Sequence, residues 1–183
     1  MITMASKSKT KGKTFEREIA NFLSDLYDES FTRVPYSGAF IGGKNMFRKE
    51  KLDEAQIRGF KSDIIPPDGW GKLNIECKHY AEFPFHALLR PDRIPLLDQW
   101  IAQTYDAADE GDVNLIIMKF NRRGRFVMFE KKASIRKVGQ QVHLVSSYHY
   151  AYYKDWIMMD FDQFWFANKG LVKELSNSLP SSL

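Results

Sequence analysis

The two segments that decide the fold are Lys61-Ser62-Asp63-Ile64-Ile65 and Asn74-Ile75-Glu76-Cys77-Lys78, with the run Pro66-Pro67-Asp68-Gly69 between them. The Pro-Pro-Asp-Gly run is strong turn chemistry. We therefore predict strands over 58–65 and 73–80, paired as a hairpin. Because side chains alternate faces along a strand, Glu76 and Lys78 should project together, on the face opposite Ile75 and Cys77.

The predicted hairpin places Asp63 beside Glu76. Neighbouring carboxylates repel each other unless a cation compensates, and like charges placed opposite each other destabilise a sheet. A hard divalent cation with oxygen ligands is the natural compensation. A lysine beside it, Lys78, suits a site that also holds an anion such as a hydroxide or a phosphate. Together these residues indicate metal-dependent phosphodiester hydrolysis. The alternative is a surface hairpin in which Glu76 and Lys78 form an ordinary ion pair.

A third carboxylate comes from the segment 14–27, whose apolar residues recur at helical spacing and predict a helix. Glu16 lies on the same strip of that helix as Ala20 and Leu23, so it borders the buried face. A metal site would give this carboxylate a partner, although the helix dipole alone also favours an acid in a first turn. Glu18 lies about 200° around the helix from Glu16 and is predicted to be solvated.

The remaining pattern predicts a mixed α/β domain. Further strands are expected at 31–36, 113–120, 125–130 and 141–146, a helix at 94–108, and a long loop at 38–51 followed by a helical turn at 52–57. The aromatic segment 150–175 is predicted to be helical. The domain organisation that we expect is a flexible basic arm over 1–13, a nuclease core over 14–147, and an aromatic helical extension over 148–183 that packs on the core or on a dimer interface.

Length and composition limit the class of protein. The 183 residues, 44% of them hydrophobic, suit one domain with a substantial core. A single cysteine, Cys77, excludes a disulfide framework and a cysteine-rich zinc site. The apolar runs are shorter than the ~20 residues of a membrane span, and the basic N-terminal region has no apolar segment of a secretory signal behind it. We expect a soluble cytoplasmic protein with no membrane partner.

Positive charge is concentrated in two places. The chain has 27 basic and 23 acidic residues, a net charge of +4, and the first thirteen residues supply all of the excess through Lys7, Lys9, Lys11 and Lys13. Segment 119–137 holds eight basic residues and one acid, Glu130. Such local patches suit a polyanionic partner. A solvated tail and an ordinary charged hairpin are the alternative.

Four segments resemble, in the same order, the motifs of archaeal-type Holliday junction resolvases, a branch of the PD-(D/E)XK nuclease superfamily. They are Lys11-Gly12-Lys13-Thr14-Phe15-Glu16-Arg17-Glu18-Ile19, Arg33-Val34-Pro35-Tyr36-Ser37-Gly38, Ser62-Asp63-Ile64-Ile65 and Ile75-Glu76-Cys77-Lys78. Ser62 stands where the superfamily motif usually has proline. The resemblance covers 11–80 and implies a single-domain, restriction-endonuclease-like core with a mixed central sheet flanked by helices.

The resemblance also implies a set of roles. Glu16, Asp63 and Glu76 are the expected ligands of Mg²⁺, for which Mn²⁺ can substitute. Lys78 is expected to orient or help deprotonate the attacking water, and Ser37 to contact the scissile phosphate. DNA-backbone contacts are expected from Lys7, Lys9, Lys11, Lys13, Arg33, Lys44, Arg48, Arg122, Arg123 and Arg125.

The function expected from the resemblance is the structure-selective cutting of four-way DNA junctions. Symmetric cutting needs two active sites, so we expect a homodimer. The insert over 39–57 and the aromatic C-terminal part are longer than in compact resolvases, which leaves open another DNA substrate and thus a restriction or repair endonuclease acting on linear or damaged duplex. Two further alternatives are a non-catalytic DNA-binding protein, against which the presence of all four polar site residues argues, and an RNA-processing enzyme.

Several other polar residues are given structural interpretations. Gln99 and Gln103 lie one turn apart on the predicted second helix, where some relatives have a glutamine near the active site, but a polar stripe on an exposed helix is the favoured interpretation. His79 is interpreted as structural. The spacing of the other histidines, His86, His143 and His149, does not indicate a metal site.

Overall fold

The computed structural model describes residues 4–35, 62–131, 134–137, 140–143 and 149–177. Its elements, in chain order, are α1 (Met4–Tyr27), β1 (Thr32–Arg33), β2 (Ile64–Ile65), β3 (Leu73–Tyr80), the 3₁₀ helix η2 (Phe85–Leu89), α3 (Pro95–Ala107), β4 (Val113–Phe120), β5 (Gly124–Glu130), β6 (Ser134–Lys137), β7 (Gln140–His143), β8 (Tyr150–Tyr153), β9 (Trp156–Asp160) and α4 (Phe161–Ser176). Of these described helices, none is both long enough and apolar enough to cross a membrane.

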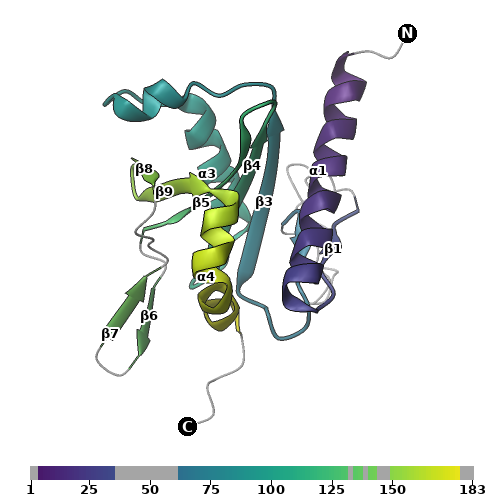
Figure 1. Cartoon of the computed structure of the whole chain (residues 1–183), viewed down its shortest axis with the longest axis vertical. Helices are drawn as coiled ribbons and strands as arrows, with labels where there is room; N and C mark the ends of the chain where they lie inside the picture. Colours follow the sequence, from purple (N-terminus) through teal and green to yellow (C-terminus); the bar gives the residue numbers. More distant parts are fainter. Residues whose placement is uncertain (1–3, 36–61, 132–133, 138–139, 144–148, 178–183) are drawn as a thin grey trace.

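A five-stranded mixed sheet in the order β3-β4-β5-β9-β8 forms the centre (Figure 1). Strands β3 and β4 are parallel, with Glu76 opposite Ile116, and the other neighbours are antiparallel. Helix α3 lies on the connection between the two parallel strands, as a parallel pair requires. The mixed α/β architecture with helices on the sheet is the fold expected of a PD-(D/E)XK core.

The two faces of the sheet are covered by different helices. Residues of α1 and α4 pack with Ile75, Leu115 and Ile117 in one buried cluster. Residues of α3 and η2 pack with Ile116 and Met118 in the other. Because neighbouring residues of β4 alternate between these clusters, the strand is buried on both faces, as its continuous apolar run predicts.

Helix α1 begins ten residues earlier than predicted. We expected a flexible arm over 1–13, but residues 4–13 continue the helix. The Thr14 hydroxyl donates to the Thr10 carbonyl at 2.9 Å, four residues back, which fits an unbroken helix. Lysine is a good helix former, so a lysine-rich segment joined to an amphipathic helix extends it at little cost. Phe15, Ile19 and Leu23 form the predicted apolar face and are fully buried.

The C-terminal segment is part of the central sheet, which corrects the prediction of a wholly helical extension over 148–183. Residues 150–153 and 156–160 are strands, and β9 pairs with β5. Only α4 is helical, and the Asp160 side chain caps it by accepting from the Gln163 amide at 3.0 Å. The aromatic residues of this segment were predicted to lie in the core or in a dimer interface. Trp156, Phe161 and Phe164 are at most 2% exposed and belong to the core, whereas Phe166 is 82% exposed.

Strand β2 pairs with β1, not with β3 as in the predicted hairpin. Both β1 and β2 are only two residues long in the described chain, shorter than the predicted strands over 31–36 and 58–65. The hairpin prediction was nevertheless right that Asp63 lies next to β3. The Asp63 amide donates to the Ile75 carbonyl at 3.0 Å, so the residue before β2 is hydrogen-bonded to the edge of the central sheet.

Candidate active site

Asp63 is fixed by its backbone on two sides. Its amide is bonded to Ile75 of β3, and its carbonyl accepts from the Val34 amide at 3.0 Å. The side chain is 8% exposed, and its Oδ2 accepts from the Cys77 amide at 2.8 Å. This buried carboxylate therefore lies against the middle of β3, beside the residue that follows Glu76.

Glu76 and Lys78 project from the same face of β3, as the alternation predicted. Their Oε1 and Nζ atoms are 2.5 Å apart, and both side chains are mostly buried. The Lys78 ammonium also donates to Oε1 of Gln103 on α3 at 2.7 Å. An ammonium with two acceptors is held in place, and it retains donor capacity for a substrate oxygen.

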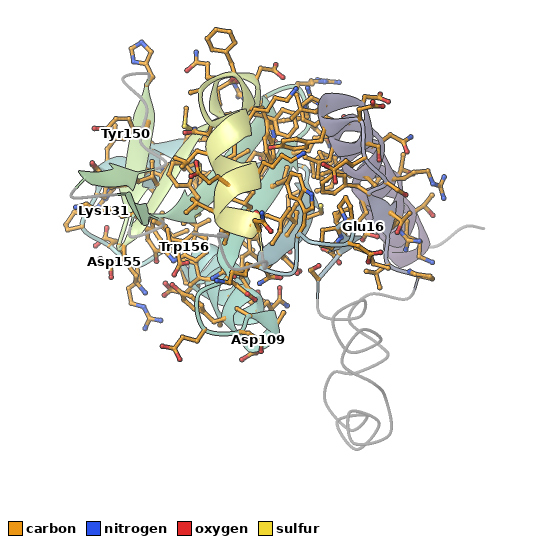
Figure 2. The ribbon with its side chains drawn as sticks, turned by 90° about the horizontal axis from the view of Figure 1, so that it is seen from below. Glu16, Asp109, Lys131, Tyr150, Asp155 and Trp156 are labelled. Carbon is orange, nitrogen blue, oxygen red and sulfur yellow. The ribbon has the colours of Figure 1, made fainter. Side chains whose placement is uncertain are left out.

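Glu16 lies at the edge of the α1 core face and is paired with Arg33 of β1. The Glu16 Oε2 and Arg33 Nε atoms are 2.5 Å apart, and the two side chains are 12% and 18% exposed. Figure 2 shows Glu16 on the α1 side of the molecule, away from Tyr150 and Trp156 on β8 and β9. Arg33, which was expected to contact DNA, is thus engaged with one of the candidate acids.

The three acids act on one another electrostatically. Burial and, after it, the charge of Asp63 raise the pKa of Glu76 to about 7, with Lys78 opposing the change. Burial and the charge of Asp63 also raise the pKa of Glu16, and Arg33 opposes this. Because each carboxylate lies close enough to disfavour the ionisation of another, the cluster is short of positive charge.

The chemistry of the donors fits a hard divalent cation, which prefers carboxylate oxygens. Glu16, Asp63 and Glu76 would hold it, as the motif predicted, and the added charge would relieve their repulsion. Within the residues described, no three acidic, histidine or cysteine side chains already surround a single point in the manner of a metal site. One oxygen of Glu16 is paired with Arg33 and one oxygen of Glu76 is paired with Lys78, so these two cations already offset part of the negative charge of the cluster.

Glu76→Gln is expected to stabilise the metal-free protein at pH 8, on the order of 2–3 kcal/mol, because the wild type must ionise a buried carboxyl whose pKa is about 7. A raised carboxyl pKa favours the folded state at low pH and loses that contribution as pH rises through 7. The advantage of the variant should therefore shrink below 1 kcal/mol near pH 5. Urea unfolding of wild type and Glu76→Gln at pH 8 and pH 5 measures this difference in the free energy of unfolding. The same difference at both pH values would contradict the raised pKa of Glu76.

The other predicted contact residues are scattered or lie outside the described residues. Ser37, Lys44 and Arg48 belong to the second group, as do the predicted loop and turn over 38–57. Lys7 and Lys9 lie on α1, where Lys11 and Lys13 are exposed. The turn between β4 and β5 carries Arg122 and Arg123, and β5 carries Arg125.

Two polar residues make contacts that the sequence analysis did not predict. Gln103 is exposed, as expected of a polar stripe, but it also accepts a hydrogen bond from Lys78. Glu18 was predicted to be solvated, and its side chain is 36% exposed, but it also forms ion pairs with Lys119 at 2.7 Å and Arg125 at 3.4 Å. The helical-wheel angle was right, but β4 and β5 supply cations on that side of α1. The signal for Gln103 was the glutamine that some relatives have near the active site, and not the local spacing.

One of three comparisons with known proteins finds a family for this chain. The family described as "Phage putative PDDEXK endonuclease" matches residues 7–174, nearly the whole chain. No curated protein and no solved structure matches this chain significantly. The match includes every element that positions Glu16, Asp63, Glu76 and Lys78, and it covers α4 as well. The chain therefore belongs to this family of phage PDDEXK endonucleases and is a nuclease of the PD-(D/E)XK superfamily.

Proposed function

We propose that this nuclease is a metal-dependent DNA endonuclease that cuts four-way junctions as a homodimer. The observation that carries the chemical part is the cluster of Asp63, Glu76 and Lys78 at the edge of β3, with Glu16 of α1 coupled to it. The branched substrate is supported by the resemblance of segment 11–80 to archaeal-type resolvases.

In the proposed reaction, the three carboxylates would hold a divalent cation, Mg²⁺ or Mn²⁺, which would supply polarisation of the phosphate and a lowered pKa of a bound water. Lys78 supplies an ammonium donor to the attacking water and to the negative charge that develops on the phosphate. Gln103 holds that ammonium in place through the 2.7 Å hydrogen bond. Asp63 is anchored by the Cys77 amide, so its carboxylate is oriented before substrate binds.

The two-fold symmetry of a four-way junction supports a homodimer, because paired cuts need two active sites in one complex. The exposed lysines of α1 and the arginines of the β4–β5 turn would contact phosphates. Such contacts position the DNA without reading its sequence, and they make binding strongly dependent on salt. We place the enzyme in the cytoplasm, where this substrate lies.

A cleavage assay on matched substrates tests the proposal. A four-way junction, a linear duplex of the same sequence and an RNA duplex are incubated with Mg²⁺, with Mn²⁺ and with EDTA, with Asp63→Asn as the contamination control. We expect paired symmetric cuts in the junction only, and only with a metal. Equal cutting of the linear duplex would favour a restriction or repair enzyme, and cutting of RNA alone would favour RNA processing. Tight binding without cutting would favour a DNA-binding protein.

A further inference from the structure

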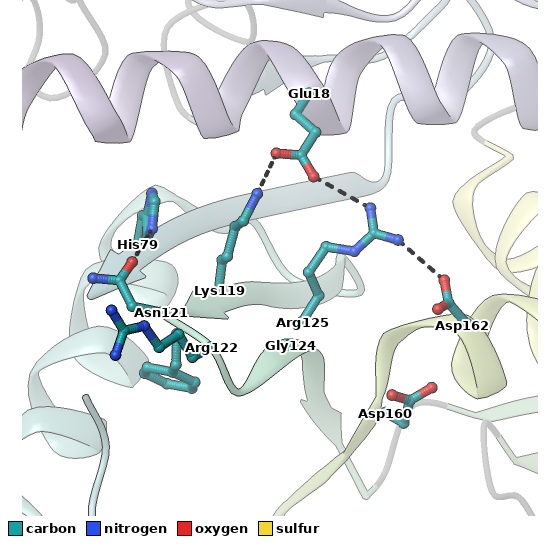
Figure 3. A pocket seen from close by; sticks show the side chains of 10 residues that line it. Glu18, His79, Lys119, Asn121, Arg122, Gly124, Arg125, Asp160 and Asp162 are labelled. Atoms are coloured by element: carbon teal, nitrogen blue, oxygen red, sulfur yellow. Dashed lines mark hydrogen bonds and ion pairs between the residues drawn. The ribbon is translucent and has the colours of Figure 1, made fainter. Parts of the chain in front are cut away.

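A pocket of about 620 Å³ opens at the C-terminal ends of β3 and β4, on the face covered by α1 (Figure 3). Its charged and polar lining includes the cations Lys119, Arg122 and Arg125, the acids Glu18, Asp160 and Asp162, and His79. His79 directly follows Lys78 on β3. Consecutive strand residues point to opposite faces, so the pocket and the candidate active site lie on the two sides of one strand end.

Aromatic rings hold two of the cations in the pocket. The Lys119 ammonium lies 5.6 Å from the centre of the Phe15 ring, and the Arg125 guanidinium lies 4.2 Å from that of Phe161. Cation–π contacts of this geometry are attractive and do not need a carboxylate. These two side chains therefore have support that is independent of their acidic partners.

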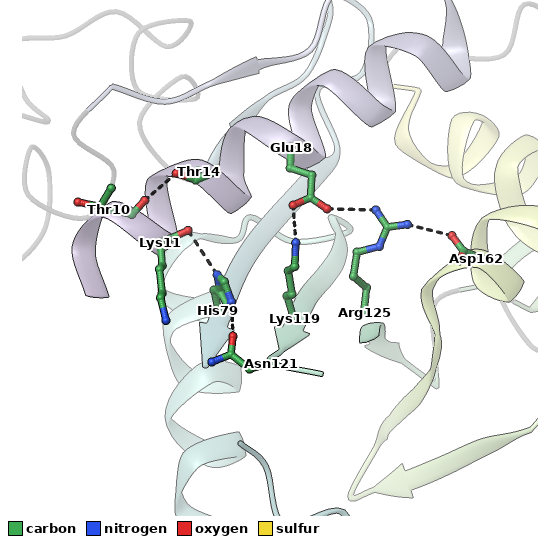
Figure 4. A network of polar contacts seen from close by, with 9 residues as sticks. All are labelled: Thr10, Lys11, Thr14, Glu18, His79, Lys119, Asn121, Arg125 and Asp162. Carbon is green, nitrogen blue, oxygen red and sulfur yellow. Dashed lines mark hydrogen bonds and ion pairs between the residues drawn. The ribbon is translucent and has the colours of Figure 1, made fainter. Parts of the chain in front are cut away.

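Glu18 lies between the same two cations. Its two carboxylate oxygens are 2.7 Å from Lys119 and 3.4 Å from Arg125, and Asp162 lies on the far side of Arg125 at 3.1 Å (Figure 4). The Glu18 side chain is 36% exposed and that of Asp162 is 76% exposed. Ion pairs as open to solvent as these are weak, so another anion can replace them. Asp160 differs, because its carboxylate caps α4.

Arg122 adds a third cation to the lining of the pocket, and it has no ion-pair partner within the part of the chain that the structure describes. Its backbone adopts the left-handed conformation with φ +58°. An arginine is uncommon at such a position, which Asn or Gly occupies more easily. Oδ1 of the neighbouring Asn121 accepts a hydrogen bond from Nε2 of His79 at 3.1 Å, and the other ring nitrogen, Nδ1, is 3.4 Å from the Lys11 carbonyl oxygen. These contacts join the β4–β5 turn, β3 and α1 at the pocket.

We propose that this pocket binds a backbone phosphate of the DNA substrate, and that Glu18 occupies the phosphate position in the free protein. The inference rests on the proposed function, because it requires DNA as the ligand. A phosphate would take the place of the Glu18 carboxylate between Lys119 and Arg125, with Arg122 at the rim. A DNA strand that crosses the end of β3 would then be held by the pocket on one side of β3, while Lys78 acts on the DNA from the other side of β3. Glu18 is thus an internal competitor that weakens the binding of DNA.

The first test removes the competing carboxylate. Glu18→Gln should bind a DNA duplex about 2- to 5-fold more tightly than wild type at low salt in EDTA, because the phosphate no longer has to displace the weak, exposed ion pairs of Glu18 with Lys119 and Arg125. The matched control is Glu110→Gln, which makes the same change of net charge in the connection before β4, at the other end of that strand. Equal tightening in both variants would be a general charge effect and would overturn the role of Glu18.

The second test removes a pocket cation. Lys119→Gln should make the slope of log K against log salt less steep by about 1, as the loss of one phosphate contact predicts. Lys72→Gln, an exposed lysine just before β3, should leave the slope unchanged. If both pocket variants bind DNA like their controls and only lower Tm, the ion pairs merely hold α1 to the sheet and the inference fails. A wild type that binds DNA and cuts it in that case keeps the proposed function, whereas one that does neither loses both.

Discussion

Asp63→Asn is expected to lower the rate of DNA cleavage by at least about 10²–10³-fold, the usual cost of losing one preorganised electrostatic group in an active site. Asparagine has nearly the shape of aspartate, and its Oδ1 can still accept the 2.8 Å hydrogen bond from the Cys77 amide. The substitution therefore removes a charge without removing the contact that places the side chain. Initial rates on the preferred substrate, at saturating Mg²⁺, measure the loss.

The folded state should not suffer from this change, which separates a catalytic role from a structural one. Asp63 raises the pKa of both Glu16 and Glu76, so its negative charge opposes their ionisation. Asp63→Asn removes that repulsion, and Tm without metal should be unchanged or higher. DNA binding in EDTA should be unchanged or tighter, because a negative charge near the phosphate is gone.

Asp68→Asn is the matched control. Asp68 is exposed in the turn that follows β2, five residues from Asp63, and the substitution changes net charge by the same amount. Its cleavage rate should stay within about 2-fold of wild type, as expected for a surface change away from the site. If Asp63→Asn also cuts within that range, the carboxylate cluster is not the catalytic centre.

The parts of the fold that could be predicted from the sequence are those that local patterns of polar and apolar residues determine. Strands β3 and β4 have the bounds expected, because one alternates and the other is a continuous apolar run. Helix α3 begins within a residue of its prediction. The convergence of Asp63, Glu76 and Lys78 also follows from alternation on a single strand and a short connection.

The rest depends on partners far away in the sequence. Strand β9 is defined by its pairing with β5, and the aromatic segment around it does not distinguish a strand from a buried helix by periodicity. Gln103 meets Lys78 because α3 is fixed against β3: the buried Asn74 side chain donates to the Thr104 carbonyl at 3.0 Å, one residue further along. No local pattern reveals that helix–strand contact, nor that of Glu18 with β4.

The integration of α4 into the domain leads to the second large prediction. Phe164→Ala should lower the free energy of unfolding by about 3–5 kcal/mol, because it empties a fully buried ring site. The centre of the Phe164 ring lies 5.1 Å from the ring centre of Phe129 on the central strand β5 and 5.0 Å from that of Trp165. For a protein of this size the corresponding fall in Tm is about 6–20 °C.

Phe166→Ala provides the control on the same helix. Phe166 is two residues further along α4 and 82% exposed, so its replacement should change the free energy of unfolding by less than about 0.5 kcal/mol. The pair also tests how α4 is attached. If α4 were an appended extension, Phe164→Ala would leave the main unfolding transition in place and loosen only the C-terminal part. Because α4 and β5 share one buried cluster, we expect a single transition, shifted as a whole and followed equally by tryptophan fluorescence and far-UV circular dichroism.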